Sequence, residues 1–133
     1  MSEERKGNVL GVGGVFFRSK DPGRLGSWYE EHLGFRVEAW GDTRGASFAP
    51  SDMPPASFTV WSAFAAGTEY FGDSGQSYMI NLVVDDLDAA LANVAAGGAD
   101  VLEEREEHDF GRFGWFVDPD CNRVELWEPP EPE

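Results

Sequence analysis

Apolar and polar positions alternate most regularly near the C-terminal end of the chain, over residues 112–127. Two apolar, aromatic-rich runs there flank residues 118–122, Asp-Pro-Asp-Cys-Asn, and Pro and Asx residues between such runs are typical of a tight turn. The pattern therefore predicts a β-hairpin. In its second strand, period-two alternation places Glu125 and Trp127 on one face and Leu126 on the other. Glu125 is thus either a carboxylate on a solvated sheet face or one inside a concave pocket.

Two further segments carry apolar residues at helical spacing, and each has start and stop signals. The first begins at Asp21-Pro22, an N-cap followed by proline at the first helical position, and ends at Gly34. The second begins after Asp85-Asp86 and ends at Gly97-Gly98. The sequence therefore predicts two helices, whose apolar stripes are Leu25, Trp28, Tyr29 and Leu33 in the first and Leu87, Ala90, Leu91 and Val94 in the second.

Short β-prone runs surround each helix and repeat in the same order. They cover residues 9–17, 35–40, 45–48 and 58–64 in the first half, and 78–84, 101–106, 110–117 and 123–127 in the second. Each half reads strand, helix and three strands, and two copies are too few for a solenoid.

We therefore expect one domain over residues 1–133, built from module 1 at about 8–64, a connector at 65–77 and module 2 at about 78–128. Each module would bury its helix against one face of its sheet. The opposite faces would then form a shared concave surface.

Composition changes this picture mainly through charge. Ten Lys plus Arg against 25 Asp plus Glu give a formal net charge of -15, which repels nucleic acid and anionic membrane surfaces. No apolar run approaches the roughly 20 residues of a membrane helix, and residues 1–7 lack a signal core. We expect a soluble, cytoplasmic protein that binds neither nucleic acid nor membrane. The single cysteine, Cys121, excludes an internal disulfide framework and a Cys-based zinc site.

Four motifs stand out together, namely Asp21-Pro22 and residues 28–35 in the first half, and residues 83–90 and 116–126 in the second. In this combination they resemble the glyoxalase/bleomycin-resistance/dioxygenase superfamily, also called vicinal oxygen chelate proteins. The resemblance covers roughly residues 9 to 128. It implies an α+β fold of two βαβββ modules whose curved mixed sheets form a shared cup. Many members hold a divalent metal in that cup through four side chains, from the first and last strands of each module.

The positions that would hold this metal carry few usable ligands here. The first-strand positions fall on Gly14, which has no side chain, and on Met79, a weak soft ligand. The last strand of module 1 offers Thr59 or Trp61, and only Glu125 matches the family pattern. One carboxylate cannot fix the coordination geometry of a catalytic ion, so we expect no conventional metal and no cofactor.

Glu125 and His108 are the candidate catalytic residues. Glu125 is either a general base or ligand anchor in the cup, or a remnant satisfied by Arg18 or a neighbouring donor. His108 lies in a predicted loop that either closes over the cup with a proton-transfer group or is simply exposed. The candidate ligand-binding wall consists of Phe16, Trp61, Met79, Asn81 and Trp127, with Asn81 placed to orient a ligand carbonyl.

The resemblance implies three classes of function. The first is a binding or sequestering protein for a small organic ligand, as in the bleomycin-resistance branch. The second is a lyase or isomerase like glyoxalase I, and the third an extradiol-type dioxygenase. The missing metal ligands favour the first class, and the acidic surface suits a cationic ligand. Because the family usually pairs modules edge to edge, we also expect a homodimer.

Overall fold

Two helices and two sheets make up the described part of the computed structural model, which comprises residues 7, 12, 14–73 and 75–131. Neither helix is long and apolar enough to cross a membrane. The elements in chain order are α1 (Pro22–Leu33), β1 (Glu38–Trp40), β2 (Thr43–Gly45), the 3-10 turn η1 (Pro50–Asp52), β3 (Ile80–Val83), α2 (Leu87–Ala96), β4 (Asp100–Val101), β5 (Glu106–His108), β6 (Gly111–Val117) and β7 (Arg123–Glu128).

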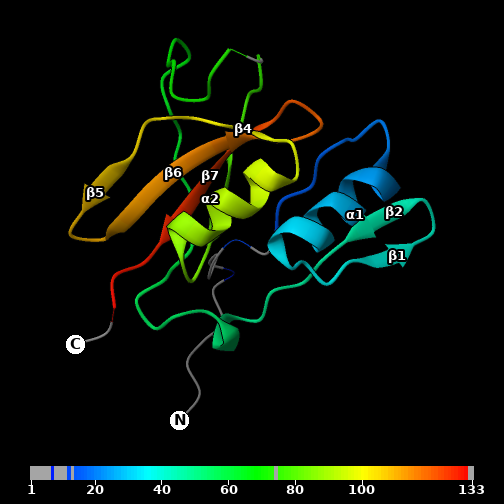
Figure 1. Ribbon diagram of the computed structural model, residues 1–133, viewed down its shortest axis with the longest axis horizontal. Coiled ribbons are helices and arrows are strands. Elements are labelled where there is room, and N and C mark those ends of the chain that lie inside the picture. The colour runs from blue at the N-terminus through cyan, green and yellow to red at the C-terminus, as the bar shows by residue number, and fades with distance from the viewer. Residues whose placement is uncertain (1–6, 8–11, 13, 74, 132–133) are drawn as a thin grey trace.

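The larger sheet has the strand order β3-β7-β6-β4, and β5 pairs with the start of β6. Strand β3 runs parallel to β7, whereas β6 and β7 form the antiparallel hairpin that the sequence predicts. Glu125 on β7 lies in register with Asn81 on β3 and with Trp115 on β6. Directly opposed residues project from the same face of a sheet, so these three share one face. Helix α2 covers the other face (Figure 1).

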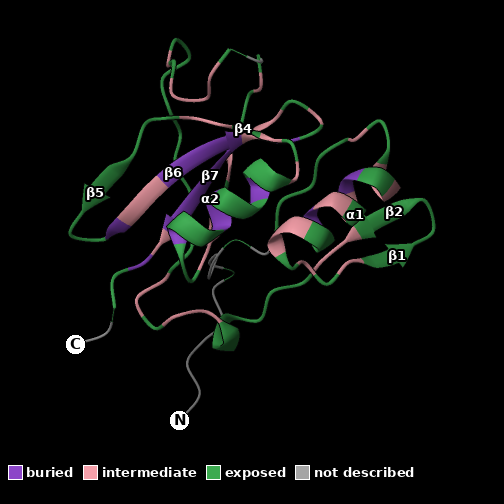
Figure 2. Cartoon of the chain, viewed as in Figure 1, coloured by how far each residue is buried: buried purple, intermediate pink, exposed green. Residues whose placement is uncertain are grey.

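The core lies between the helices and the sheet. The apolar stripe of α2 packs on the residues of β6 and β7 that face the helix, and both sets of residues are buried (Figure 2). Burying each large apolar side chain contributes roughly 1.5–3 kcal/mol. The fully enclosed members are Leu87, Val94, Phe116, Val124 and Leu126, whereas the equally enclosed Trp115 lies on the opposite face beside Glu125.

Both helices begin and end where the sequence signals place them. Asp21 Oδ1 accepts a hydrogen bond from Arg24 N at 3.1 Å, and Asp86 Oδ1 accepts one from Ala89 N at 3.0 Å. After α1 the chain turns at Gly34, which has a φ of 71°. Glycine adopts this left-handed conformation easily because it has no Cβ. The predicted caps are therefore confirmed.

The turn between β6 and β7 is built around the buried carboxylate of Asp118. Its Oδ1 accepts hydrogen bonds from the backbone N–H groups of Asp120 and Asn122, both at 2.9 Å. Its Oδ2 accepts the hydroxyl of Tyr29 at 2.8 Å, which joins α1 to the hairpin. Burial and the Asp118 carboxylate raise the pKa of Tyr29. Cys121 takes a φ of 67° in this turn, a conformation that glycine adopts more readily.

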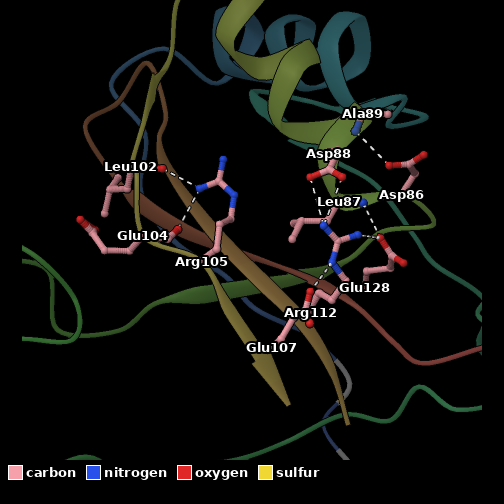
Figure 3. A network of polar contacts seen from close by, with 10 residues as sticks. All are labelled: Asp86, Leu87, Asp88, Ala89, Leu102, Glu104, Arg105, Glu107, Arg112 and Glu128. Carbon is pink, nitrogen blue, oxygen red and sulfur yellow. Dashed lines mark hydrogen bonds and ion pairs between the residues drawn. The ribbon is translucent and has the colours of Figure 1, made fainter. Parts of the chain in front are cut away.

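A network around Arg112 ties the start of α2 to the sheet (Figure 3). Its guanidinium contacts Glu128 Oε1 at 3.3 Å, Asp88 at 3.1 Å and Glu107 at 3.7 Å. Glu128 Oε1 also accepts the backbone N–H of Leu87 at 2.7 Å, which satisfies one free donor of the first helical turn.

The strand predicted over residues 101–106 is divided in two. Strand β4 ends at Val101 and β5 begins at Glu106. Between them, Arg105 Nη1 donates to the carbonyls of Leu102 and Glu104 at 2.7 and 2.8 Å (Figure 3). These carbonyls are thus satisfied by a side chain instead of a strand partner.

The α+β class is confirmed, and the sheets stay unclosed, since among its described residues module 1 contributes only the strands β1 and β2. Residues 14–17 and 58–64 form no strand, so those two predictions are wrong; residues 9–11 and 13 of the first run lie outside the described residues. A β-prone sequence becomes a strand only when a neighbouring edge pairs with it, and neither segment has one.

Candidate functional site

A broad concavity of about 2610 Å³ lies over the sheet face opposite α2. Its floor includes Asn81, Phe113, Glu125 and Trp127 from the larger sheet. The segments 14–17 and 58–64 border it, together with residues 65, 66, 68, 70–72 and 75–77 of the connector. This concavity is the cup that the repeat of two modules predicts, and it is wider than an ordinary ligand pocket because the sheets do not close around it.

Glu125 is the charged group at the floor of the cup, with 7% of its surface exposed. Its Oε2 accepts hydrogen bonds from the Tyr70 hydroxyl and from Trp115 Nε1, the latter at 2.9 Å. Its Oε1 accepts one from Asn81 Nδ2 at 2.7 Å. All three donors are neutral, and no described basic residue forms an ion pair with Glu125. The suggested partner Arg18 is therefore not its counter-charge.

Tyr70 reaches this carboxylate from the connector. Its ring stacks on Phe64 at 5.4 Å between centroids and meets Trp115 edge-on at 6.0 Å. Burial and the hydrogen bond to Glu125 raise the pKa of Tyr70, so its hydroxyl keeps its proton and remains a donor. Sequence reasoning missed Tyr70 because the surrounding Gly, Ser and Asp residues are typical of an exposed connector.

The end of the connector is held by the side-chain amide of Gln76. Gln76 Oε1 accepts the backbone N–H of Arg123 at 2.7 Å, and Nε2 donates to the carbonyls of Arg123 at 3.0 Å and Tyr78 at 2.7 Å. The amide thus bonds to β7 as a neighbouring peptide group would. This contact fixes the connector beside the strand that carries Glu125.

Aromatic rings form one wall of the cup. Trp127 lies parallel to Phe113, with 6.1 Å between ring centroids and 6° between planes, and it contacts Phe58 at 5.0 Å. Its Nε1 donates to the carbonyl of Phe110 at 2.8 Å. A Cβ at Gly111 would lie 2.3 Å from the Trp127 indole nitrogen, so glycine is required there. These contacts fix the orientation of the Trp127 ring in the wall.

The sequence-predicted residues divide into three groups. Glu125, Asn81, Met79 and Trp127 all line the cup around its floor. Phe16 and Trp61 also line it, but with 96% and 80% of their surface exposed they make little contact with the rest of the protein. Their part in ligand binding remains a prediction.

His108 belongs to the third group, because it lies outside the lining of the cup. It is in strand β5 and not in the loop that the sequence suggests, since the β5–β6 hairpin turns one residue later. Its ring stacks on Phe110 at 4.8 Å, and its Nε2 lies 3.0 Å from Glu106 Oε1. Among the described residues, Glu106 is therefore the one charged partner beside His108.

The residues of the cup do not fit the divalent metal that the superfamily often carries. Among the described residues, no three His, Cys, Asp or Glu side chains are grouped closely enough to hold an ion. Both oxygens of Glu125 already accept hydrogen bonds from Tyr70, Trp115 and Asn81. A hard divalent ion needs several oxygen or nitrogen ligands in a defined geometry, and this set offers one carboxylate.

Comparison with known proteins agrees with this architecture, which is that of the vicinal oxygen chelate superfamily. Residues 14–127 match the family model described as a glyoxalase-like domain, and the chain belongs to that family. No curated protein matches the chain.

Two solved structures with low sequence identity show the same fold. TioX from Micromonospora sp. ML1 is 20% identical with a TM-score of 0.51, covering 84% of this chain and 93% of that one. The hypothetical protein SA1046 from S. aureus is 16% identical with a TM-score of 0.55, covering 83% and 89%. TnmS3, an antibiotic binding protein from Streptomyces sp. CB03234, is 23% identical with a TM-score of 0.49, covering 84% and 88%.

Proposed function

We propose that this protein binds a small planar organic molecule in the cup and holds it without a divalent metal. The observation that carries the proposal is the buried Glu125 carboxylate, satisfied by neutral donors and lying beside the parallel rings of Trp127 and Phe113. Apolar concavities with a few fixed polar groups are where proteins bind small molecules. Aromatic walls favour flat ligands because offset stacking adds to the burial of apolar surface.

The wall is tested with acridine as a flat probe, by quenching of tryptophan fluorescence. Phe58 and Phe48 make a matched pair, since they are 56% and 59% exposed and both border the cup. Phe58 packs on Trp127, whereas Phe48 packs on Phe35 beside α1. We expect Phe58→Ala to weaken acridine binding about tenfold, the effect of roughly 1.4 kcal/mol of lost contact. Phe48→Ala is expected to change it less than twofold, and equal losses in both variants would contradict the proposed site.

The metal-free prediction separates this function from the glyoxalase I-like lyase or isomerase that the resemblance also implies. We expect less than stoichiometric metal after dialysis against zinc, nickel, manganese and iron, measured by elemental analysis. The reason is that Gly14 and Met79 occupy positions where ligands would be needed. Near-stoichiometric retention of any of these ions would favour the lyase.

A further inference from the structure

The hydrogen bonds on Glu125 leave one acceptor position open toward the cup. A carboxylate oxygen has about two lone-pair sites. Tyr70 and Trp115 occupy both sites of Oε2, whereas Asn81 occupies one site of Oε1. Because Glu125 lines the cavity, the remaining site of Oε1 is the one that a ligand would reach.

A second acceptor lies directly beside it. An ionised carboxylate only accepts hydrogen bonds, so Asn81 must turn its NH2 group toward Glu125 and its Oδ1 away from it. Asn81 is exposed to the cup, and no donor among the described residues bonds to its Oδ1. Since Asn81 and Glu125 are paired in register on β3 and β7, the two open acceptors are close neighbours on one sheet face.

Among the described residues, no basic side chain forms an ion pair with the Glu125 carboxylate of this acceptor pair. Arg123, the next residue on the same face of β7, places its guanidinium over the Trp115 ring at 5.6 Å and forms no ion pair with Glu125 in the described structure. The protein as a whole carries a formal charge of -15, which also attracts cations. A flat cation here would in addition lie near the aromatic wall, whose exposed ring is Phe58, packed on Trp127, and this favours cation–π contact.

We propose that the cup selects planar aromatic cations that present two neighbouring N–H donors, such as a ring-fused amidine or guanidine, to Glu125 Oε1 and Asn81 Oδ1. This inference rests on the proposed function, and it assigns the ligand class. It differs from the role that the sequence suggests for Asn81, because the NH2 group that would orient a ligand carbonyl already donates to Glu125.

Three flat probes of similar size test the donor requirement by isothermal titration calorimetry. The first is 2-aminobenzimidazole, which carries two neighbouring N–H donors. The second is 2-methylbenzimidazole, in which a methyl group replaces the amino group. The third is coumarin, which offers a carbonyl and no N–H. We expect 2-aminobenzimidazole to bind at least about tenfold more tightly than 2-methylbenzimidazole, and coumarin to bind most weakly. A buried acceptor left unpaired by the wrong ligand accounts for such a ratio.

Two variants test whether Glu125 and Asn81 cause the preference for 2-aminobenzimidazole. Glu125→Gln should reduce the ratio between the first two probes to about one, and Asn81→Ser should reduce it severalfold if the first variant does not fold. Phe48→Ala, which removes a ring that packs on Phe35 and not on Trp127, should preserve the ratio.

Equal binding of all three probes, weakened by Phe58→Ala, would overturn this inference and leave the proposed function intact. Tighter binding of coumarin would overturn the donor requirement in the same way. Failure of every flat probe, acridine included, would reject both.

Discussion

At the scale of single residues, Glu125 is the point where three separate parts of the chain meet. Tyr70 comes from the connector, Asn81 from β3 and Trp115 from β6, and each donates one hydrogen bond to the same carboxylate. Burial of a charge is costly unless hydrogen bonds replace the water that is lost. Glu125 is therefore both the anchor proposed for a ligand and a junction that holds the floor of the cup together.

The first prediction separates these two roles by substitution. Glu125→Ala should lower the free energy of unfolding by about 3 kcal/mol, because three buried donors lose their acceptor. Glu125→Gln should change it by less than about 1 kcal/mol, since Asn81 can reverse its amide and the buried charge is removed. Urea denaturation of both variants measures the difference. Equal stability of Glu125→Ala and the wild type would mean that the carboxylate is not part of the fold.

At the scale of elements, two polar contacts join α2 to the sheet, and they differ in strength. One is the set of ion pairs around Arg112, and the other is the hydrogen bond between Glu128 and the backbone of Leu87. The Arg112 ion pairs are largely solvated, since 73% of the Asp88 side chain and 79% of that of Glu107 are exposed. Such pairs contribute little. Glu128 is more enclosed and accepts both Arg112 and the backbone N–H of Leu87.

The second prediction follows from this inequality. Glu128→Ala should destabilise the protein by about 1 kcal/mol, the typical effect of losing a bond to the first helical turn. Arg112→Met should cost less than about 1 kcal/mol, and that cost should shrink in high salt. Thermal melts at low and high ionic strength compare them. A loss in Arg112→Met that exceeds that of Glu128→Ala and shrinks with salt would show that the ion pairs hold α2 in place.

How far the sequence predicts the elements depends on how local their signals are. Both helices and the terminal hairpin follow from short-range features such as Asp21, Asp86 and the turn at 118–122, and the structure confirms them. Residues 58–64 are equally β-prone but need a distant partner edge, which no local pattern specifies. The same reason explains why the sequence predicts Glu125 as a site residue but not Tyr70. The alternation within its own strand marks Glu125, whereas its donor Tyr70 lies 55 positions away.

At the scale of the whole molecule, the three tyrosines connect stability to alkaline pH. The pKa values of Tyr29, Tyr70 and Tyr78 are all raised, mainly by burial. The folded chain therefore keeps phenolic protons that the unfolded chain loses. This stabilisation is complete below the ordinary tyrosine pKa of about 10 and is lost as the pH rises above it.

The third prediction is that tyrosinate absorbance stays low above about pH 10 until the protein unfolds. The free energy of unfolding should fall there by up to about 1.4 kcal/mol per pH unit for Tyr29 alone. In Tyr29→Phe the slope should be shallower, although the loss of the bond to Asp118 lowers stability at neutral pH. Absorbance and denaturation curves across this range provide the check. Normal titration of all three tyrosines in the folded protein would contradict the packing around Tyr29 and Tyr70.

The fourth prediction concerns assembly. Apolar side chains along residues 58–64 and at Phe16 are widely exposed, and large exposed apolar patches mark sites where proteins associate. We expect a homodimer in which a second copy covers this border of the cup. Light scattering at micromolar concentration should give twice the chain mass of 14.7 kDa. Trp61→Asp should shift the mass toward the monomer, whereas Ser51→Asp, which adds the same charge at an exposed polar position, should not; a monomeric wild type would reject the dimer.

The hydrogen bonds between the Gln76 side chain and the Arg123 backbone affect strand pairing at the start of β7. An unpaired backbone N–H and C=O at a strand end can template the addition of a strand from another molecule. Here a side chain takes both positions, so the sequence itself terminates the ladder with a group that cannot be extended. The contact therefore protects only the start of β7, which is an inner strand, whereas the outer edges of the larger sheet belong to β3 and to β4 with β5.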